Sequence, residues 1–174
     1  DRLKSPLESA KSIIQHVDDG SKIAKKYRLG DAIENILKQH HGNSLVRYFY
    51  YQAIQNCNDD PDKLAKVREE DYRYDAPRPQ TKEAAIVMLA DSSEASTRSL
   101  DNPTPENIEK MVRSVGSVIL EDGQLDESPL TLREFHILLD TYIDVLSSIY
   151  HSRIKYPNQI EEEKQEKNND DPDN

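Results

Sequence analysis

Three histidines and one aspartate are the residues of this 174-residue sequence that could bind a metal ion together. His40 and His41 are adjacent and end one stretch of helical apolar periodicity, and His16 lies late in another. Asp91 follows eight residues of which seven are apolar, so we expect it to be buried. A carboxylate in an apolar helix must be paired, hydrogen-bonded or bound to a metal. Imidazole and carboxylate together suit Zn, Fe or Mn.

The adjacent pair restricts where such a site could form. Neighbouring residues on an α-helix point about 100° apart, because one turn takes about 3.6 residues. His40 and His41 could therefore reach one ion only at a helix end, where the backbone turns. Gly42 is well suited to end that helix. The negative end of the helix dipole would also favour a nearby cation.

Each of these residues also has a purely structural explanation. His16 could be a core or boundary histidine, and the His40–His41 pair could be a polar helix end. Asp91 could cap a helix or pair with an arginine, the candidates being Arg78 and Arg98. Two further histidines lie among apolar residues in the last long helix and are interpreted as structural: His136 and His151.

Helical periodicity extends through almost the whole sequence, and no segment alternates with the period of a strand. We predict an all-α fold with six or seven helices. The first helix is expected to break within residues 18–29, where a short second one begins, and residues 57–80 read as a long connection containing a short helix. The predicted N-terminal signals are capping boxes at Ser5/Glu8 and Thr131/Glu134, caps at Asp31, Thr81 and Thr104, and Pro6 and Pro105 at first helical positions.

Composition limits the possible partners. The formal net charge is −10, and half of it lies in residues 157–174, whose seven acids and two bases predict a disordered acidic tail after a domain formed by residues 1–156. An acidic domain is a poor partner for a nucleic acid polymer. The single cysteine, Cys57, excludes an internal disulfide and fits a reducing compartment. No apolar run is long enough to span a membrane, and no signal peptide is visible.

Several long motifs resemble one family. The strings "LKQHHGNSLVRYFY", "DYRYDAPRPQTKEAAIVMLADSSEASTRSL", "NPTPENIEKMV" and "DGQLDESPLTLREF" are similar to the HD-domain phosphohydrolases carried at the cytoplasmic end of bacterial seven-transmembrane proteins, the PgpH type. The resemblance covers about residues 1 to 157. It implies an HD-domain-like helical bundle around two divalent metal ions, iron or manganese. By motif, the implied metal ligands in this sequence are His16, His40, His41 and Asp91.

The sequence departs from the family pattern in one respect. The family's first histidine and its His-Asp dipeptide are missing, and no His-Asp pair occurs anywhere in the chain. We therefore expect the C-terminal portion of an HD domain, incomplete at its N-terminus. A half-site of this kind should bind metal weakly, expose apolar surface that further helices would cover, and lack useful catalysis by itself.

The resemblance implies a phosphodiesterase that hydrolyses cyclic di-AMP to a linear dinucleotide. The parent would be a multi-pass protein, with this soluble part on the cytoplasmic face of the bacterial membrane and able to form a homodimer. Candidate substrate contacts are Arg47, Arg78 and Lys82 for phosphate and Tyr48, Tyr72 and Tyr74 for adenine, with solvation or core packing as the alternative for each. Two other functions stay open: a catalytically silent nucleotide-sensing or docking module, and a phosphatase of another nucleotide such as guanosine tetraphosphate.

Overall fold

The computed structural model describes residues 5–151, and the regular secondary structure of this part of the chain is helical, without a β-sheet. The elements are α1 Pro6–Lys26, α2 Asp31–Gln39, α3 Arg47–Gln55, α4 Pro61–Leu64, the 3₁₀ helix η1 Glu69–Tyr72, α5 Lys82–Arg98, α6 Pro105–Glu121 and α7 Leu132–His151. The predicted all-α fold is therefore confirmed. The predicted tail at residues 157–174, and the domain boundary before it, lie outside the described residues.

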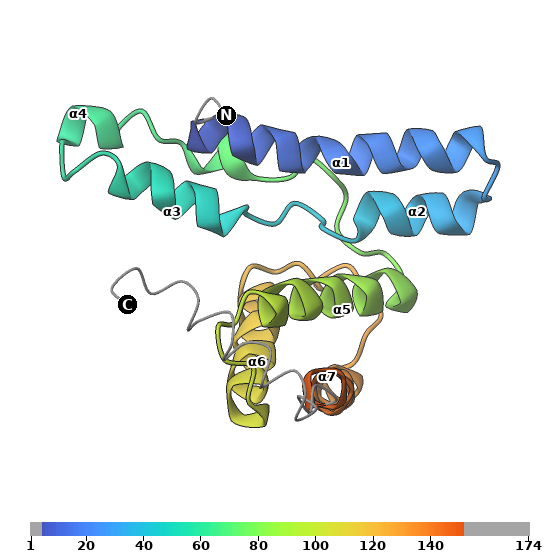
Figure 1. The fold of residues 1–174 in the computed structure, drawn as a ribbon. Helices are drawn as coiled ribbons and strands as arrows, with labels where there is room; N and C mark the ends of the chain where they lie inside the picture. Colours follow the sequence, from blue (N-terminus) through green and yellow to red (C-terminus); the bar gives the residue numbers. More distant parts are fainter. Residues whose placement is uncertain (1–4, 152–174) are drawn as a thin grey trace, which may run out of the picture.

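The helices form two groups that lie one above the other (Figure 1). In the first group, here called the upper layer, α1 packs along α2, α3 and η1, and α4 lies at the end beyond α3. In the second group, the lower bundle, α5, α6 and α7 pack against one another. Contacts between α2 and α5 join the two groups.

The two groups have very different hydrophobic cores. The core of the lower bundle includes Leu89, Ile108 and Val112, none of which has exposed surface. The buried cluster of the upper layer consists of Ala10, Ala53 and Tyr72, surrounded by partly buried residues. Burying a large aliphatic side chain stabilises by about 1.5–3 kcal/mol. The lower bundle is therefore the better-packed support for any site shared by both groups.

The predicted break within residues 18–29 is wrong, because α1 is one continuous helix. Its buried residues continue past the expected break at helical spacing: Ala10, Val17, Ser21 and Ala24. Gly20 costs roughly 1 kcal/mol relative to alanine inside a helix, and packing of this face against α2 offsets that cost. Ile13 is 38% exposed and lies on another face of α1.

The predicted capping signals are present with one exception. Ser5 and Glu8 form a capping box at the start of α1, and Thr131 and Glu134 form another before α7. Thr81 and Thr104 cap their helices as predicted. Asp31 is instead the first residue of α2, and the cap is Gly30, whose φ of 88° is a conformation that glycine adopts without strain.

The predicted connection between residues 57 and 80 contains α4 and η1, and it carries the chain from the end of α3 back to α5. One isolated antiparallel bridge, between Leu45 and Arg73, ties it to the segment before α3. No helix in the described part of the chain is both long and apolar enough to cross a membrane.

Candidate metal centre

Three imidazoles meet where α1 faces the turn after α2. The Nε2 atom of His16 lies 3.5 Å from Nε2 of His40 and 3.1 Å from Nε2 of His41. One ligand nitrogen from each ring lies within 4.8 Å of the others. Nitrogens bound at about 2.0–2.1 Å to one tetrahedral ion are on the order of 3.3 Å apart. The three rings are thus spaced like ligands of one shared ion.

Hydrogen bonds on the opposite ring nitrogens indicate which atoms are free to bind a cation. His16 Nδ1 donates to the carbonyl of Ile13 at 2.5 Å, and His40 Nδ1 donates to the carbonyl of Leu37 at 2.7 Å. A carbonyl only accepts, so each Nδ1 carries the proton and each neutral ring keeps a lone pair on Nε2. Two lone pairs then face each other without a donor between them. A divalent cation satisfies this arrangement, and backbone contacts of this kind orient metal-binding histidines.

The turn that follows α2 brings the adjacent histidines together, as the sequence predicted. The helix ends at Gln39, His40 keeps helical dihedral angles, and Gly42 has a φ of 53°. This left-handed residue lets the backbone leave the helix directly after the pair. His40 and His41 therefore have ring centroids only 4.1 Å apart.

The surroundings of His41 keep its ring neutral. Burial, together with the neighbouring His40 and His16, lowers the pKa of His41 to about 3. Tyr74 stacks on the His41 ring with centroids 4.5 Å apart and planes 15° from parallel. Burial and the nearby Asp91 raise the pKa of Tyr74 to about 12. The uncharged imidazole is the form that binds metal, so this environment favours a ligand.

Asp91 lies beside the histidines but is not buried, which corrects the prediction. Its carboxylate is 3.9 Å from His41 Nε2, and its side chain is 48% exposed. The apolar residues before it belong to the other face of α5, which packs into the lower bundle. Neither suggested arginine is its partner among the described ion pairs, since Arg98 pairs with Glu94 and Arg78 with Asp126.

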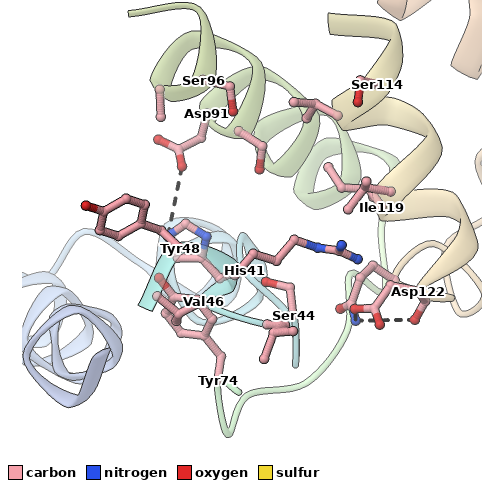
Figure 2. A pocket seen from close by; sticks show the side chains of 17 residues that line it. His41, Ser44, Val46, Tyr48, Tyr74, Asp91, Ser96, Ser114, Ile119 and Asp122 are labelled. Carbon is pink, nitrogen blue, oxygen red and sulfur yellow. Dashed lines mark hydrogen bonds and ion pairs between the residues drawn. The ribbon is translucent and has the colours of Figure 1, made fainter. Parts of the chain in front are cut away.

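A cavity of about 440 Å³ opens beside these residues, between the upper layer and the groove of α5 and α6. Figure 2 shows Asp91 on α5 directed at His41, with Tyr48 and Tyr74 on the same side of the cavity and Asp122 at the opposite end. The volume is within the usual range for small-molecule pockets of about 300–1,000 Å³. The candidate metal ligands thus lie at one end of a ligand-sized space.

The candidate substrate contacts separate into those that line this cavity and those that do not. Arg47, Tyr48 and Tyr74 line it. Lys82 forms an ion pair of 2.5 Å with Glu134 between α5 and α7, and Arg78 lies near Asp126 and Asn43, away from the cavity wall. Of the remaining residues, Tyr72 is buried in the core of the upper layer and His136 is exposed on α7, while the side chain of His151 lies outside the described part.

The sequence analysis missed a polar network that joins the histidine turn to the end of α6. Gln124 is completely buried, and its Nε2 donates to Asn43 Oδ1 at 2.7 Å and to Asp122 Oδ2 at 2.8 Å. Arg73 donates to both oxygens of Asp122, at 2.8 and 3.0 Å, and to the Asn43 carbonyl at 2.9 Å. Asn43 and Gln124 are 81 residues apart, so no local periodicity relates them.

Comparison with known proteins indicates the family. The model of the HD domain matches residues 1–96, a segment that contains all four candidate metal ligands. Two curated relatives are named Cyclic-di-AMP phosphodiesterase PgpH. The one from Bacillus subtilis (strain 168) is 44% identical over 153 residues, covering 88% of this chain and 20% of that protein. The one from Listeria monocytogenes serotype 1/2a (strain 10403S) is 41% identical over 157 residues, covering 90% and 21%.

Solved structures agree with this family. The crystal structure of the HD domain of L. monocytogenes phosphodiesterase PgpH superposes with a TM-score of 0.75 at 38% identity, covering 85% of this chain and 66% of that one. The same domain in complex with Cyclic-di-AMP gives 0.76 at 40% identity, covering 90% and 70%. This chain spans about a fifth of the length of the curated relatives.

Proposed function

Because this chain belongs to the HD domain family, we propose that it supplies part of a metal-dependent phosphodiesterase centre that hydrolyses cyclic di-AMP to a linear dinucleotide. The observation that carries the proposal is the convergence of three histidine Nε2 atoms beside a ligand-sized cavity. The names of the relatives, and the neighbour solved with Cyclic-di-AMP, support the choice of substrate.

The residues present fit one divalent ion, for which we propose iron or manganese. His16, His40 and His41 would hold it, with Asp91 next to His41. Such an ion, when bound, supplies a Lewis acid and a water nucleophile at neutral pH. The protein's part is to keep the His41 imidazole uncharged and to turn the Nε2 lone pairs of His16 and His40 toward one point. The complete domain would hold two ions, and the second needs ligands such as the His-Asp pair that this sequence lacks.

An exposed face of α1 supports the proposal that more chain completes the site. Ile13, His16, Ile23 and Tyr27 follow one another at intervals of three, seven and four residues, the spacing by which one helix packs along another. Ile13, Ile23 and Tyr27 are 38%, 55% and 65% exposed. A helix laid on this face would cover His16 and could bring a further ligand to it.

For the substrate, we propose that Arg47 binds a phosphate and that Tyr48 stacks on a base. Both line the cavity, and Tyr48 is 71% exposed. Arginine forms paired hydrogen bonds with phosphate oxygens, and aromatic rings stack on bases. Tyr74 already stacks on His41, so its proposed contact with substrate is secondary. Arg78 and Lys82 are weaker candidates because they lie outside the cavity wall.

We propose that the working protein is longer and membrane-anchored, with this domain on the cytoplasmic face of a bacterial membrane and able to form a homodimer. The length of the relatives, about five times the segment matched here, supports a larger parent. A nucleic acid polymer is not a partner in this proposal, because the domain is acidic.

A catalytically silent nucleotide-sensing or docking module is the second candidate, supported by the ligand-sized cavity that Arg47 and Tyr48 line. It would use the same cavity to bind a cyclic dinucleotide without cutting it. The cavity can serve either function, since Arg47 and Tyr48, which line it, are not among the candidate metal ligands.

The test is metal content combined with hydrolysis. The chain would be purified without chelator and with iron or manganese supplied, then compared with a version extended at its amino end through a His-Asp motif of the parent. We expect about one weakly held ion and no hydrolysis for the chain, and two ions with hydrolysis for the extended version. In the extended version, His41→Ala should abolish hydrolysis. His136→Ala, which changes an exposed residue of α7, should leave hydrolysis unchanged. Two ions without hydrolysis in the extended protein would contradict the enzyme and favour the silent module.

A further inference from the structure

We infer that Gln124 and Asn43 form a clamp that positions the histidine turn of the upper layer relative to Asp91 of the lower bundle. The histidines belong to α1 and the turn after α2, whereas Asp91 belongs to α5. The two groups of helices have separate hydrophobic cores, so the separation of His41 and Asp91 depends on what joins those cores. This inference rests on the proposed metal centre and concerns how its two halves are held together.

The contacts of the clamp are specific in direction. Gln124 Oε1 accepts from the backbone N–H of Asn43 at 3.1 Å, while Gln124 Nε2 donates to Asn43 Oδ1 at 2.7 Å. One side-chain amide thus holds both the backbone and the side chain of a residue two positions after His41. Gln124 has no exposed surface, and an unsatisfied buried amide would cost about 1–3 kcal/mol. The arrangement in which the Gln124 amide bonds both the backbone and the side chain of Asn43 is therefore strongly preferred over one that leaves this amide without partners.

Gly42 is required by the same arrangement. A Cβ atom at this position would collide with Gln124 Oε1 and lie 3.2 Å from Met88 Cε. The positive φ of 53° adds a second reason for glycine. The turn that bears His41 thus approaches the lower bundle closely because Gly42 has no side chain.

Charged residues support the clamp from both sides. Asp122 accepts from Gln124 Nε2 and from two nitrogens of Arg73, and Arg73 also donates to the carbonyl of Asn43. Arg73 immediately precedes Tyr74, which stacks on His41. The network therefore fixes the turn through Asn43 and the ring of His41 through Tyr74. Networks in which every member is satisfied are rigid and specify one arrangement.

The test must measure how the two groups are positioned relative to each other, independently of metal binding and of overall stability. Spin labels at Lys11→Cys on α1 and Lys110→Cys on α6 would report the distance between the two groups by double electron–electron resonance. Both lysines are exposed, and the native Cys57 is buried, which protects it from labelling. Gln124→Glu keeps the shape of the side chain but places a carboxylate against Asp122. Gln55→Glu, on exposed α3 surface, is the matched control.

We expect Gln124→Glu to keep its helix content by circular dichroism and to broaden the distance distribution about twofold, as independent motion of two cooperative units predicts. Gln55→Glu should leave it unchanged. If Gln124→Glu does not fold, Asn43→Ala, which keeps the backbone contact to Gln124, takes its place with a smaller broadening. A folded variant with an unaltered distribution and only a lower melting temperature would overturn the inference.

A second measurement links the clamp to the site. Co²⁺ binding, followed by visible absorption, should weaken at least about 10-fold in Gln124→Glu, the low end of what loss of a supporting contact costs a metal site. Asp91→Asn should weaken Co²⁺ binding in the otherwise unchanged chain. In the Gln124→Glu chain the same change should cause no further loss of affinity, since the clamp then no longer holds the histidine turn beside Asp91. Independent effects of the two changes would overturn the positioning role. No Co²⁺ binding by the unchanged chain would instead count against the metal centre, and the spin-label distances would still decide the clamp.

Discussion

The upper layer and the lower bundle differ in how they are stabilised and in what they contribute to the site. The lower bundle buries large aliphatic side chains such as Leu89 and Ile108, whereas the buried cluster of the upper layer consists of two alanines and a tyrosine. Yet the upper layer provides the three histidines, and the lower bundle provides Asp91. The less well packed group thus carries most of the candidate metal ligands.

This difference suggests why the ligands and the exposed face of α1 occur together. A group with few buried contacts opens locally at low free energy, and a metal ion or an added helix can stabilise it. Binding to the folded state alone shifts the equilibrium toward it. The lower bundle depends less on such help, because its three helices bury a core of large aliphatic side chains. We therefore expect metal to act mainly on the upper layer.

The largest expected effect separates the two cores directly. Leu89→Ala should reduce the free energy of unfolding by about 2–5 kcal/mol, because it leaves a cavity in the best-packed part of the chain. The matched pair is Val112→Ala in the lower bundle and Val17→Ala in the upper layer, whose side chains are 0% and 7% exposed. We expect Val112→Ala to reduce the free energy of unfolding more than Val17→Ala does, as measured by urea denaturation. Equal costs would mean that the two cores are equally well packed and would remove the comparison.

Metal should stabilise one group selectively. A divalent ion at 100 times its dissociation constant stabilises the folded state by about 2.7 kcal/mol. We expect added Mn²⁺ to slow amide hydrogen exchange in α1 and α2, which the three histidines connect, and to change α6 and α7 little. A chelator should reverse the effect and His41→Ala should abolish it, while His136→Ala should preserve it. Uniform protection along the chain would contradict the selectivity.

Part of this arrangement could be predicted from the sequence. Serine, threonine and glutamate at capping spacing located the starts of α1, α5, α6 and α7, because a cap is a local interaction. The adjacency of His40 and His41 with Gly42 predicted a helix end from the geometry of one turn. The break expected within residues 18–29 was wrong because a glycine in a helix is a weak signal, which tertiary packing overrides.

The remaining features depend on contacts between distant segments. The apolar run before Asp91 correctly indicated a buried helix face, but not that Asp91 itself points away from that face. Asn43 and Gln124 lie 81 residues apart, and their pairing follows from the packing of α2 against α5, which in turn packs against α6. Polar residues buried by tertiary structure carry no periodic signal, so this network could not be predicted.

Acid should weaken the connection between the two groups before it unfolds either core. Arg73, followed by Gln124, holds the pKa of the Asp122 carboxyl below its ordinary value of 3.8. A lowered folded-state pKa gives stability that is fully present above 3.8 and is lost as the pH falls through the lower value. Hydrogen bonds to charged groups contribute about 1.5–3 kcal/mol. Asp122→Asn should therefore lower the free energy of unfolding by about that much at pH 7. On going to acid, its free energy of unfolding should fall less than that of the unchanged chain, and urea denaturation at each pH measures both.

The smallest effect compares the same local motif in the two groups. Ser5→Ala in the upper layer and Thr131→Ala in the lower bundle each remove a capping box, which costs about 0.5–2 kcal/mol of helix stability. If the groups unfold together, both changes should lower the global free energy of unfolding by similar amounts. If the upper layer opens by itself, Ser5→Ala should speed hydrogen exchange in α1 and leave the exchange of α6 unchanged, whereas Thr131→Ala should act on the lower bundle. Equal acceleration of α1 and α6 by Ser5→Ala would show that the two cores form one cooperative unit despite their different packing.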